Sequence, residues 1–491
     1  QPVLEVRDQF GNLRNAANGI TQGDLVTATR LAGSGTLQGT TSMTSTNGIA
    51  SFLNLSHNLA NTITIQFSTG SATATSSPIA VSAGNPSRLV FSTQPGNGTA
   101  GSALAPQPVV MAQDAFGNNT TAGLPASLPV TMTLSSGTGP LQGTATLDIG
   151  TAAGNGTATF TNLRIDTAGT GKQLTASAAG LSNAVSTPFT VNPGAASSLV
   201  MQTQPPTTVT AGATFSPASV VRILDAFGNL VTTDSSTVIT AARSLGTAAL
   251  QGTTSATAVN GVATFPNLSY TKAEPITIGF SSGSLTGATS TSVTVNPAAA
   301  SKLTIQTQPS ATATAGVAFA PQPVVRIEDT YGNLRSSDNS TVVTVGRSAG
   351  SGTLQGTLTA TAVNGVVTFA NLSHNVANTI TLSFTATGLT SATSGNVVVS
   401  PAAFAKLQLL VPGETAAPGS ASGKTGTPTA STAATAFNIT VNAVDSFWNV
   451  VNTITDMVDI SSTDANATLP ADAALVAGTK TLSVTFKTAG S

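Results

Sequence analysis

The amino-acid sequence predicts an all-β protein, built as a tandem array of antiparallel β-sandwiches that form an elongated rod. Three observations predict this fold class: a set of motifs that recurs about every 105 residues, short segments in which apolar and polar residues alternate, and the lack of any helical stripe of apolar residues. A repeat of this length is too long for a solenoid unit of about 20 to 50 residues and suits one small domain that folds by itself.

The recurring motifs set the boundaries of the expected domains. An Asp followed by an aromatic residue and an Asn, as in "DAFGN", recurs at separations of 106, 111, 104 and 116 residues. The motifs "LQGT" and "NGVATFPNL", or close variants, recur in phase with it. Short segments with Pro and small residues separate the repeats and favour a stiff rod over a flexible string. We expect domains at residues 1–83, 84–193, 194–297, 298–401 and 402–491, called units 1 to 5 below.

The two terminal units are expected to be incomplete. Gln1-Pro2-Val3 aligns with Gln107-Pro108-Val109, so unit 1 lacks the opening strand "RLVFSTQP" and the "TAG" that follows it in unit 2. Unit 5 is divergent, with Trp448 in place of the motif Gly, without the "LQGT" and "NG" motifs, and with its closing strands missing. Either the sequence is a window on a longer chain, which we favour, or strands from neighbouring molecules fill the gaps, as in donor-strand filaments.

Alternating residues predict the strands within each unit. Segments such as "TITIQFS" (Thr62 to Ser68), "VTMTLS" (Val130 to Ser135) and "TITLSF" (Thr379 to Phe384) place apolar residues at every second position. This is the pattern of a strand that is buried on one face, and β-branched Thr, Val and Ile suit a pleated sheet. About seven short strands per unit, separated by turn residues, indicate a sandwich.

The acidic motif predicts a structural corner at the end of a strand. An Asp that leaves a strand can accept hydrogen bonds from the next backbone N–H groups, and the Gly and Asn tolerate the positive φ of a tight reversal. The aromatic residue, for example Phe116 or Tyr331, is expected to cover the end of the sandwich. The corner residues are Asp8, Asp114, Asp225, Asp329 and Asp445, with Gly11, Gly117, Gly228 and Gly332.

The "NG" motif predicts a hairpin followed by a core strand. The Asn-Gly pairs at 47–48, 155–156, 260–261 and 364–365 suit type I′ turns. Because aromatic residues make up only 4% of the chain, the ring in the strand after each turn should supply a large share of the core. These core rings are Phe52, Phe160, Phe265 and Phe369.

The charge balance disfavours two classes of partner. The net charge is −1, and 17 Lys and Arg in 491 residues leave no basic surface for nucleic acid or an anionic membrane. The sequence contains no run of about 18 apolar residues, and therefore no membrane span is predicted. The chain has no cysteine and therefore no disulfide framework. N-x-S/T triplets such as Asn97-Gly98-Thr99 allow glycans, although such triplets are expected by chance in a chain rich in Thr and Ser.

A catalytic or metal-binding role for the acidic motif is disfavoured. General acid–base catalysis needs a partner for each Asp, and the only two histidines, His57 and His374, occur in two of the units. We therefore expect neither enzyme activity nor a cofactor. Calcium is the stronger rival, since it can stiffen the junctions of surface domains, but the chain has only 18 Asp and Glu. The weak metal candidates are Asp445, Asp456 and Asp459 in the locally acidic unit 5.

The motif set resembles a known family. The corner "D-x-F-G-N" followed by "N-G-x-A-T-F-x-N-L" is similar to the bacterial immunoglobulin-like domains of invasin and intimin type adhesins and of very large surface proteins. The resemblance covers essentially the whole chain. It implies an immunoglobulin-like sandwich, and it implies a spacer role more than a specific activity.

These observations lead to one main functional hypothesis and two alternatives. The chain is expected to be a structural segment of a secreted extracellular filament, sheath or surface layer. Its hydroxyl-rich faces and exposed edge strands would favour self-association with neighbouring chains. The alternatives are a spacer stalk of a large bacterial adhesin and accessory domains of a secreted enzyme. All three place the protein outside the cell or on its surface.

Overall fold

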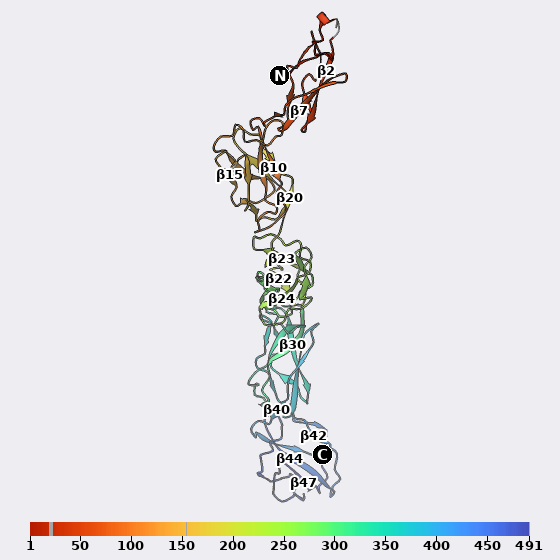
Figure 1. Ribbon diagram of the computed structural model, residues 1–491. Helices are drawn as coiled ribbons and strands as arrows, with labels where there is room; N and C mark the ends of the chain where they lie inside the picture. The colour runs from red at the N-terminus through yellow and green to blue at the C-terminus, as the bar shows by residue number, and fades with distance from the viewer. Residues whose placement is uncertain (19–22, 154, 491) are drawn as a thin grey trace.

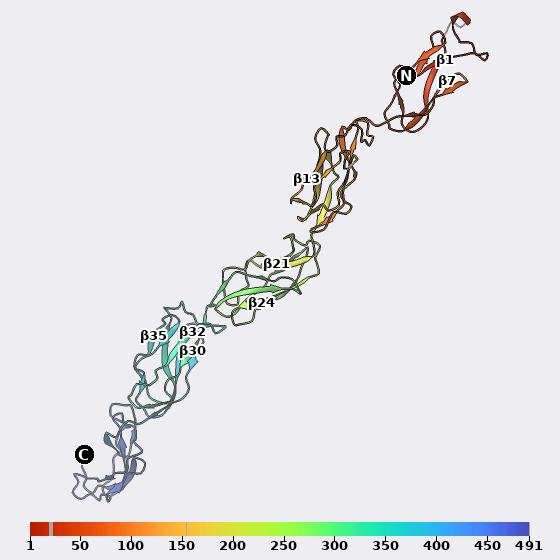
Figure 2. The same ribbon diagram turned by 60° about the vertical axis from the view of Figure 1, so that its left-hand side comes forward.

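The computed structural model describes residues 1–18, 23–153 and 155–490. It shows an elongated rod in which the units follow one another, with the N-terminus at one end and the C-terminus at the other (Figures 1 and 2). In the described ranges the regular structure is β, apart from one short 3₁₀ helix, η1 (Ala16–Asn18). No helix in these ranges is long and apolar enough to cross a membrane. The expectation of an all-β array is confirmed.

Unit 3 shows the sandwich most clearly. One sheet has the strand order β21 (Ala196–Thr203), β23 (Ser219–Asp225), β26 (Val262–Phe265). The other has the order β22 (Thr208–Thr210), β29 (Val293–Asn296), β27 (Pro275–Ser281), β24 (Val238–Leu245), β25 (Ser255–Thr257), with β28 (Ala288–Thr289) also on β27. β21 pairs antiparallel with β23, whereas β22 pairs parallel with β29, so the opening segment joins both sheets. This is the immunoglobulin-like sandwich that the resemblance implied.

Units 2 and 4 repeat this arrangement. In unit 2 the first sheet has the order β10 (Arg88–Thr93), β12 (Val109–Gln113), β16 (Thr157–Thr159). The second sheet has the order β11 (Gly98–Thr99), β20 (Phe189–Asn192), β18 (Gly169–Ser177), β13 (Pro129–Ser136), β15 (Thr146–Asp148), and β19 (Ala184–Val185) also pairs with β18. A separate small pair is formed by β14 (Leu141–Gln142) and β17 (Arg164–Ile165). In unit 4 the first sheet has the order β30 (Ala300–Thr307), β32 (Val324–Asp329), β36 (Val366–Thr368). The second sheet has the order β31 (Thr312–Thr314), β40 (Val397–Ser400), β38 (Thr379–Thr385), β33 (Val342–Ala349), β35 (Thr359–Thr361), and β39 (Ala392–Thr393) also pairs with β38. A separate small pair is formed by β34 (Leu354–Gln355) and β37 (Ser373–His374).

Units 1 and 5 are reduced versions. Unit 1 has a pair of β1 (Val3–Glu5) and β5 (Ile49–Ser51), a sheet of β4 (Ser42–Thr44), β2 (Leu25–Ala32), β7 (Thr62–Thr69) and β8 (Ala72–Thr75), with β9 (Ile79–Ala80) on β7, and a pair of β3 (Leu37–Gln38) and β6 (Ser56–His57). Unit 5 has a sheet of β41 (Lys406–Leu410), β44 (Ala436–Val444) and β47 (Thr479–Thr485), and the pairs β42 (Glu414–Ala416) with β43 (Lys424–Gly426) and β45 (Met457–Val458) with β46 (Ala473–Ala474).

Each unit range holds its own cluster of buried apolar side chains. Alternation along the strands produces these cores: in β27, Ile276, Ile278 and Phe280 are buried, and the residues between them are not. The rings of the four core Phe residues are at most 2% exposed. Three of them contact a second ring from the opposite sheet, with centroids 5.1 to 5.5 Å apart: Phe52 with Phe67, Phe265 with Phe280, and Phe369 with Phe384.

In units 1, 3 and 4 the hairpins before these strands have the backbone of type I′ turns. Asn260 and Gly261 have φ of 52° and 77°, and Val259 and Val262 exchange two backbone hydrogen bonds around them. In unit 2, Asn155 and Gly156 close a longer loop, in which the N–H of Gly156 donates to the carbonyl of Ile149 (2.8 Å).

Unit 5 has the same turn without an "NG" motif. Ala477 and Gly478 have φ of 48° and 74°, and Val476 and Thr479 exchange two backbone hydrogen bonds around them. The turn therefore survives there without Asn, at the cost of a strained Ala.

We predict that Phe265→Ala will destabilise unit 3 by about 3 to 5 kcal/mol, because it removes a fully buried ring and leaves a cavity. Native-state hydrogen exchange of the full chain should show the loss of protection in β24 and β27. Phe369→Ala is the matched control and should weaken unit 4 instead. Equal protection of unit 3 in both variants would contradict the assignment of Phe265 to that core.

We predict that Ala477→Asn will stabilise unit 5 by about 1 kcal/mol, because Asn accepts a left-handed backbone more readily than Ala. The measurement is the exchange protection of β44 and β47. Ala477→Val should have the opposite effect, since a β-branched residue is poorly tolerated at positive φ.

Candidate functional site at the joints between units

Each acidic corner is held by the carboxylate of its Asp. In unit 3, Oδ1 of Asp225 accepts from the N–H groups of Phe227 (2.9 Å) and Asn229 (2.8 Å). Oδ2 accepts from the side-chain amide of Asn229 (2.8 Å) and from the N–H of Gly194 (2.7 Å), which lies in the linker from unit 2. The carboxylate thus fixes the turn, the Asn side chain and the linker at once.

The other corners share this pattern. Asp114, Asp329 and Asp445 each accept the same four kinds of hydrogen bond, with linker donors Gly84, Ala298 and Ala402 respectively. Asp8 accepts the three bonds from its own turn. Gly11, Gly117, Gly228 and Gly332 have φ between 82° and 90°.

Trp448 takes the glycine position in unit 5 with φ of 72°. Its ring lies against Gly423 and beneath the ammonium of Lys406, 3.4 Å from the ring centroid. These contacts offset the strain of a bulky residue in the left-handed region.

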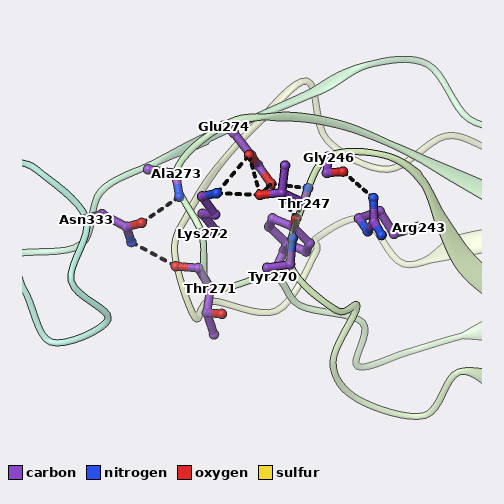
Figure 3. A network of polar contacts seen from close by, with 10 residues as sticks. Arg243, Gly246, Thr247, Tyr270, Thr271, Lys272, Ala273, Glu274 and Asn333 are labelled. Carbon is purple, nitrogen blue, oxygen red and sulfur yellow. Dashed lines mark hydrogen bonds and ion pairs between the residues drawn. The ribbon is translucent and has the colours of Figure 1, made fainter.

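In units 2 to 5 the Asn of the corner also bonds to the preceding unit. In the joint between units 3 and 4, Oδ1 of Asn333 accepts from the N–H of Ala273, and Nδ2 donates to the carbonyl of Thr271, both at 2.8 Å (Figure 3). Because Oδ2 of Asp329 accepts from the same Nδ2, the amide is held in the orientation that both backbone groups require. One side chain therefore connects two domains through two hydrogen bonds.

The same pair of hydrogen bonds occurs at the other three joints of the rod. The corner Asn residues contact a short loop of the preceding unit at distances of 2.7 to 2.8 Å: Asn118 contacts Asn58 and Ala60, Asn229 contacts Asp166 and Ala168, and Asn449 contacts Asn375 and Ala377.

The corner aromatic residues contact the preceding unit as well. The ring of Phe227 lies over Gly101 so closely that a β-carbon there would come within 2.5 Å of it. Tyr331 covers Gly212 and Phe447 covers Gly316 in the same way. The expectation that the ring covers its own sandwich is wrong: the corner projects away from its own core, and Phe227 and Tyr331 both remain 48% exposed.

At the joint between units 1 and 2, no glycine among the described residues lies beneath Phe116. In the later joints the glycine belongs to a "TAG" motif, which does not occur among residues 1–83 of the given sequence. Phe116 is accordingly 63% exposed, and Phe10 at the start of the rod is 80% exposed.

A polar network supports the loop that receives Asn333. The buried hydroxyl of Tyr270 donates to Oε1 of Glu274 (2.5 Å) and accepts from the N–H groups of Thr247 and Ala248 (Figure 3). Burial acts to raise the pKa of Glu274, but hydrogen bonds from Tyr270 and Thr247 outweigh it and lower the pKa to about 2. Glu274 is therefore an ionised acceptor at neutral pH.

The two histidines occupy the position of Tyr270 in their own units. Nε2 of His57 lies 2.8 Å from the carbonyl of Ser34, and Nε2 of His374 lies 2.8 Å from that of Ser351. Each ring thus ties the receiving loop to a neighbouring loop. Neither ring is hydrogen-bonded to a carboxylate in the described residues.

The described residues contain no group of three or more His, Asp or Glu that could hold a metal ion. Asp445, the first weak candidate, is fully buried, and its two oxygens accept four N–H hydrogen bonds. The structure does not bring Asp456 and Asp459 together with it into such a group.

The loop of the preceding unit that bonds to the corner Asn, here called the receiving loop, leaves little signal in the sequence. The groups that bind the corner Asn are backbone groups, so they require no particular side chain. The signal that recurs is an alanine six residues after the Asn of "NL", at Ala60, Ala168, Ala273 and Ala377. The "TAG" that recurs in units 2, 3 and 4 is the other trace, since its Gly receives the aromatic ring.

Comparison with known proteins gives structural likenesses alone. No family model matches the chain, and no curated protein matches it. Among solved structures, the chain is similar to invasin, a bacterial integrin-binding protein (12% identity, TM-score 0.28, covering 85% of this chain and 78% of that chain). It is also similar to the S-layer protein rSbsC(31-844), at 15% identity and a TM-score of 0.22.

A further likeness is to InvD of Yersinia pseudotuberculosis, at 18% identity and a TM-score of 0.26, covering 63% of this chain and 96% of that chain. The likeness to the S-layer protein covers 94% of this chain and 58% of that one, so this chain spans a little over half of its length. The strand order within the units defines the fold independently of these likenesses.

We predict that Asn229→Ala will loosen the joint between units 2 and 3, because it removes both hydrogen bonds to unit 2, worth about 1 to 3 kcal/mol together. Spin labels in units 2 and 3 should show a broader distance distribution. Asn12→Ala is the matched control: Asn12 has the same contacts with Asp8 and bonds to no other unit in the described chain. An unchanged distribution in Asn229→Ala would show that the joint is held by other contacts.

We predict a pH dependence for the corner of unit 2. Burial acts to raise the pKa of Asp114, but hydrogen bonds from Asn118, Gly84 and Phe116 outweigh it and lower the pKa to about 2. A lowered folded-state pKa contributes stability that is present above the ordinary value of 3.8 and is lost as the pH falls towards about 2. Thermal unfolding should therefore show Asp114→Asn less stable than the wild type at pH 7, with the gap closing between about pH 4 and pH 2. A gap that stays constant over this range would contradict the assignment.

Proposed function

We propose that this chain is a stiff structural segment of an extracellular or cell-surface protein, which holds the two ends of the segment at a fixed separation. The observation that carries the proposal is the recurring joint. At each of the four joints an Asn side chain, itself fixed by an Asp, bonds to the backbone of the preceding unit. A flexible string of domains would not need such bonds.

The linkers add to this stiffness. The Asp of each corner in units 2 to 5 accepts a hydrogen bond from the linker before its unit. Because the linker is attached at its own corner, it cannot act as a free hinge. At three joints the aromatic ring on a glycine supplies an apolar contact beside the hydrogen bonds.

Small-angle scattering tests the proposal on the full chain. A single extended conformation should fit the data. Replacement of Asn118, Asn229, Asn333 and Asn449 by Ala should give a shorter mean length and a broader set of conformations, whereas Asn12→Ala should leave the scattering unchanged. A wild-type chain that already behaves as a flexible string would contradict the proposal.

A filament or sheath, the finer form of this function, requires that rods also pack side by side. The low content of charged residues, 7%, favours such packing because little repulsion opposes it. Electron microscopy and light scattering at rising concentration distinguish the two forms. Ordered bundles would support the filament, and single rods at high concentration would support a spacer stalk.

A further inference from the structure

The joint between units 4 and 5 is covered by a hairpin of unit 5, formed by β42 and β43. The turn of this hairpin packs on the receiving loop of unit 4, where a β-carbon on Gly419 would lie 2.5 Å from the side chain of Val376. The N–H of Gly419 also donates to the carbonyl of Phe447 in the corner (2.7 Å). Val376 is accordingly 6% exposed, whereas Lys272, at the same place in unit 3, is exposed. The hairpin therefore shields this receiving loop from water.

His374 lies directly before the shielded loop and is itself fully buried, with 0% of its surface exposed. Its Nε2 lies 2.8 Å from the carbonyl oxygen of Ser351, which can only accept, so Nε2 carries the ring proton. Its Nδ1 is buried and has no hydrogen-bond partner in the described part of the chain. A neutral ring with one proton on Nε2 is the form that fits this site.

The backbone at and after His374 holds unit 5 in place. The carbonyl of His374 accepts from the N–H of Gly316 (3.0 Å), the glycine that receives the corner ring of unit 5. In the loop that follows, the carbonyl of Asn375 and the N–H of Ala377 bond to the side chain of Asn449, both at 2.7 Å. A displacement of the His374 ring would therefore disturb the groups on which the joint depends.

The surroundings of the ring favour its neutral form. Burial lowers the pKa of His374 below its ordinary value of 6.5, and the positive charge of Arg347 acts in the same direction. The carbonyls of Ser351 and Thr353 act in the opposite direction without offsetting this. Arg347 is held in place, because its Nε donates to the carbonyl of Gly352 (2.6 Å).

The adjoining elements supply no negative charge for a protonated ring. β34, which pairs with His374, and the segment 312–318 around Gly316 contain no charged residue. The charged groups of unit 5 near the joint are engaged with one another or with the corner: Asp445 accepts four N–H bonds, Glu414 pairs with Lys424 at 2.8 Å, and Lys406 lies over the ring of Trp448. A second proton on the ring would thus be a buried charge without a counter-ion, which is costly.

We propose that the joint between units 4 and 5 is acid-sensitive: it is fixed while the ring of His374 is neutral and loosens when the ring takes up a proton. A charged ring reaches water only if the receiving loop opens, and this opening releases Asn449. Histidine is suited to such a switch because its charge changes between about pH 5 and 8. The inference rests on the proposed function, to which it adds a condition under which one joint becomes flexible.

The sign of the pH dependence follows from the lowered pKa of His374. The folded loop takes up a proton less readily than the open loop, in which the pKa has its ordinary value of 6.5. The stability of the closed loop is therefore complete above pH 6.5 and falls as the pH drops below this value.

Unit 3 provides an internal control. There Tyr270 takes the place of His374, and Glu274 takes the place of Asn378 (Figure 3). Burial and the hydrogen bond to Glu274 raise the pKa of Tyr270 above its ordinary value of 10, and the pKa of Glu274 is about 2. Neither group changes its charge between about pH 7.5 and pH 5, so the joint between units 3 and 4 should not respond to acid in this range.

Spin labels on the full chain test the proposal. The chain has no cysteine, so introduced cysteines carry the labels at chosen sites, with one pair across units 4 and 5 and another across units 3 and 4. Both pairs should give narrow distance distributions at about pH 7.5. At about pH 5 the distribution across units 4 and 5 should broaden, and the other should stay narrow. The fluorescence of Trp448, the only tryptophan of the chain, should change over the same pH range.

Two variants remove the protonation site. In His374→Gln the side-chain amide can still donate to the carbonyl of Ser351, but it takes up no proton. The double variant with His374→Tyr and Asn378→Glu copies the pair of residues found in unit 3. In both variants the distribution across units 4 and 5 should stay narrow at about pH 5, and the change in Trp448 fluorescence should be lost.

Several results would overturn the proposal. A narrow distribution across units 4 and 5 at both pH values would remove the acid response and leave the proposed stiff segment intact. Broadening that persists in the two variants would place the response at another group. Equal broadening of both label pairs at about pH 5 would indicate general acid unfolding. A broad distribution already at about pH 7.5 would contradict the switch and the stiff segment together.

Discussion

The hydrogen bonds between a corner Asn and the backbone of the preceding unit are the contacts on which the shape of the rod depends. They are effective because the Asp of the same corner removes the freedom of that amide before the joint forms. Asn333, for example, donates to Asp329 and to the carbonyl of Thr271 with one nitrogen, which leaves its oxygen directed at the N–H of Ala273. Little side-chain entropy remains to be lost at the joint.

The carboxylate of the corner Asp links the core of its own unit to the joint with the preceding unit. Asp225 ends β23, a strand of the core, and also accepts from Gly194 in the linker. The direction of a core strand therefore sets the direction of the linker and of the Asn. The packing of the sandwich core fixes this strand, and the strand in turn positions the whole sandwich on the preceding unit. The contact of the aromatic ring with glycine adds buried apolar surface to a joint whose other contacts are polar.

Much of the fold followed from the sequence because it depends on local patterns. Alternation predicted strands such as β27, and the few aromatic residues, such as Phe265, are the buried rings. The turn at Ala477 has no signal in the sequence, because the backbone there is held by its neighbours and not by residue type. The joints have little signal for a related reason: the hydrogen bonds within the corner are local, whereas Thr271 and Ala273 offer only main-chain atoms to Asn333. The sequence also does not show in which direction a turn projects, so it does not predict which domain the aromatic corner residue contacts.

The main-chain character of the receiving loop has a consequence for how such proteins change over generations. When one surface recognises only peptide groups, substitutions on it need no matching substitution on the partner. A duplicated stretch of gene that contains one complete repeat carries both halves of the contact with it, so a copy can be inserted, deleted or exchanged without spoiling its neighbours. The residue just before the receiving loop already differs among the repeats: it is His57, Ile165, Tyr270 and His374 in units 1 to 4.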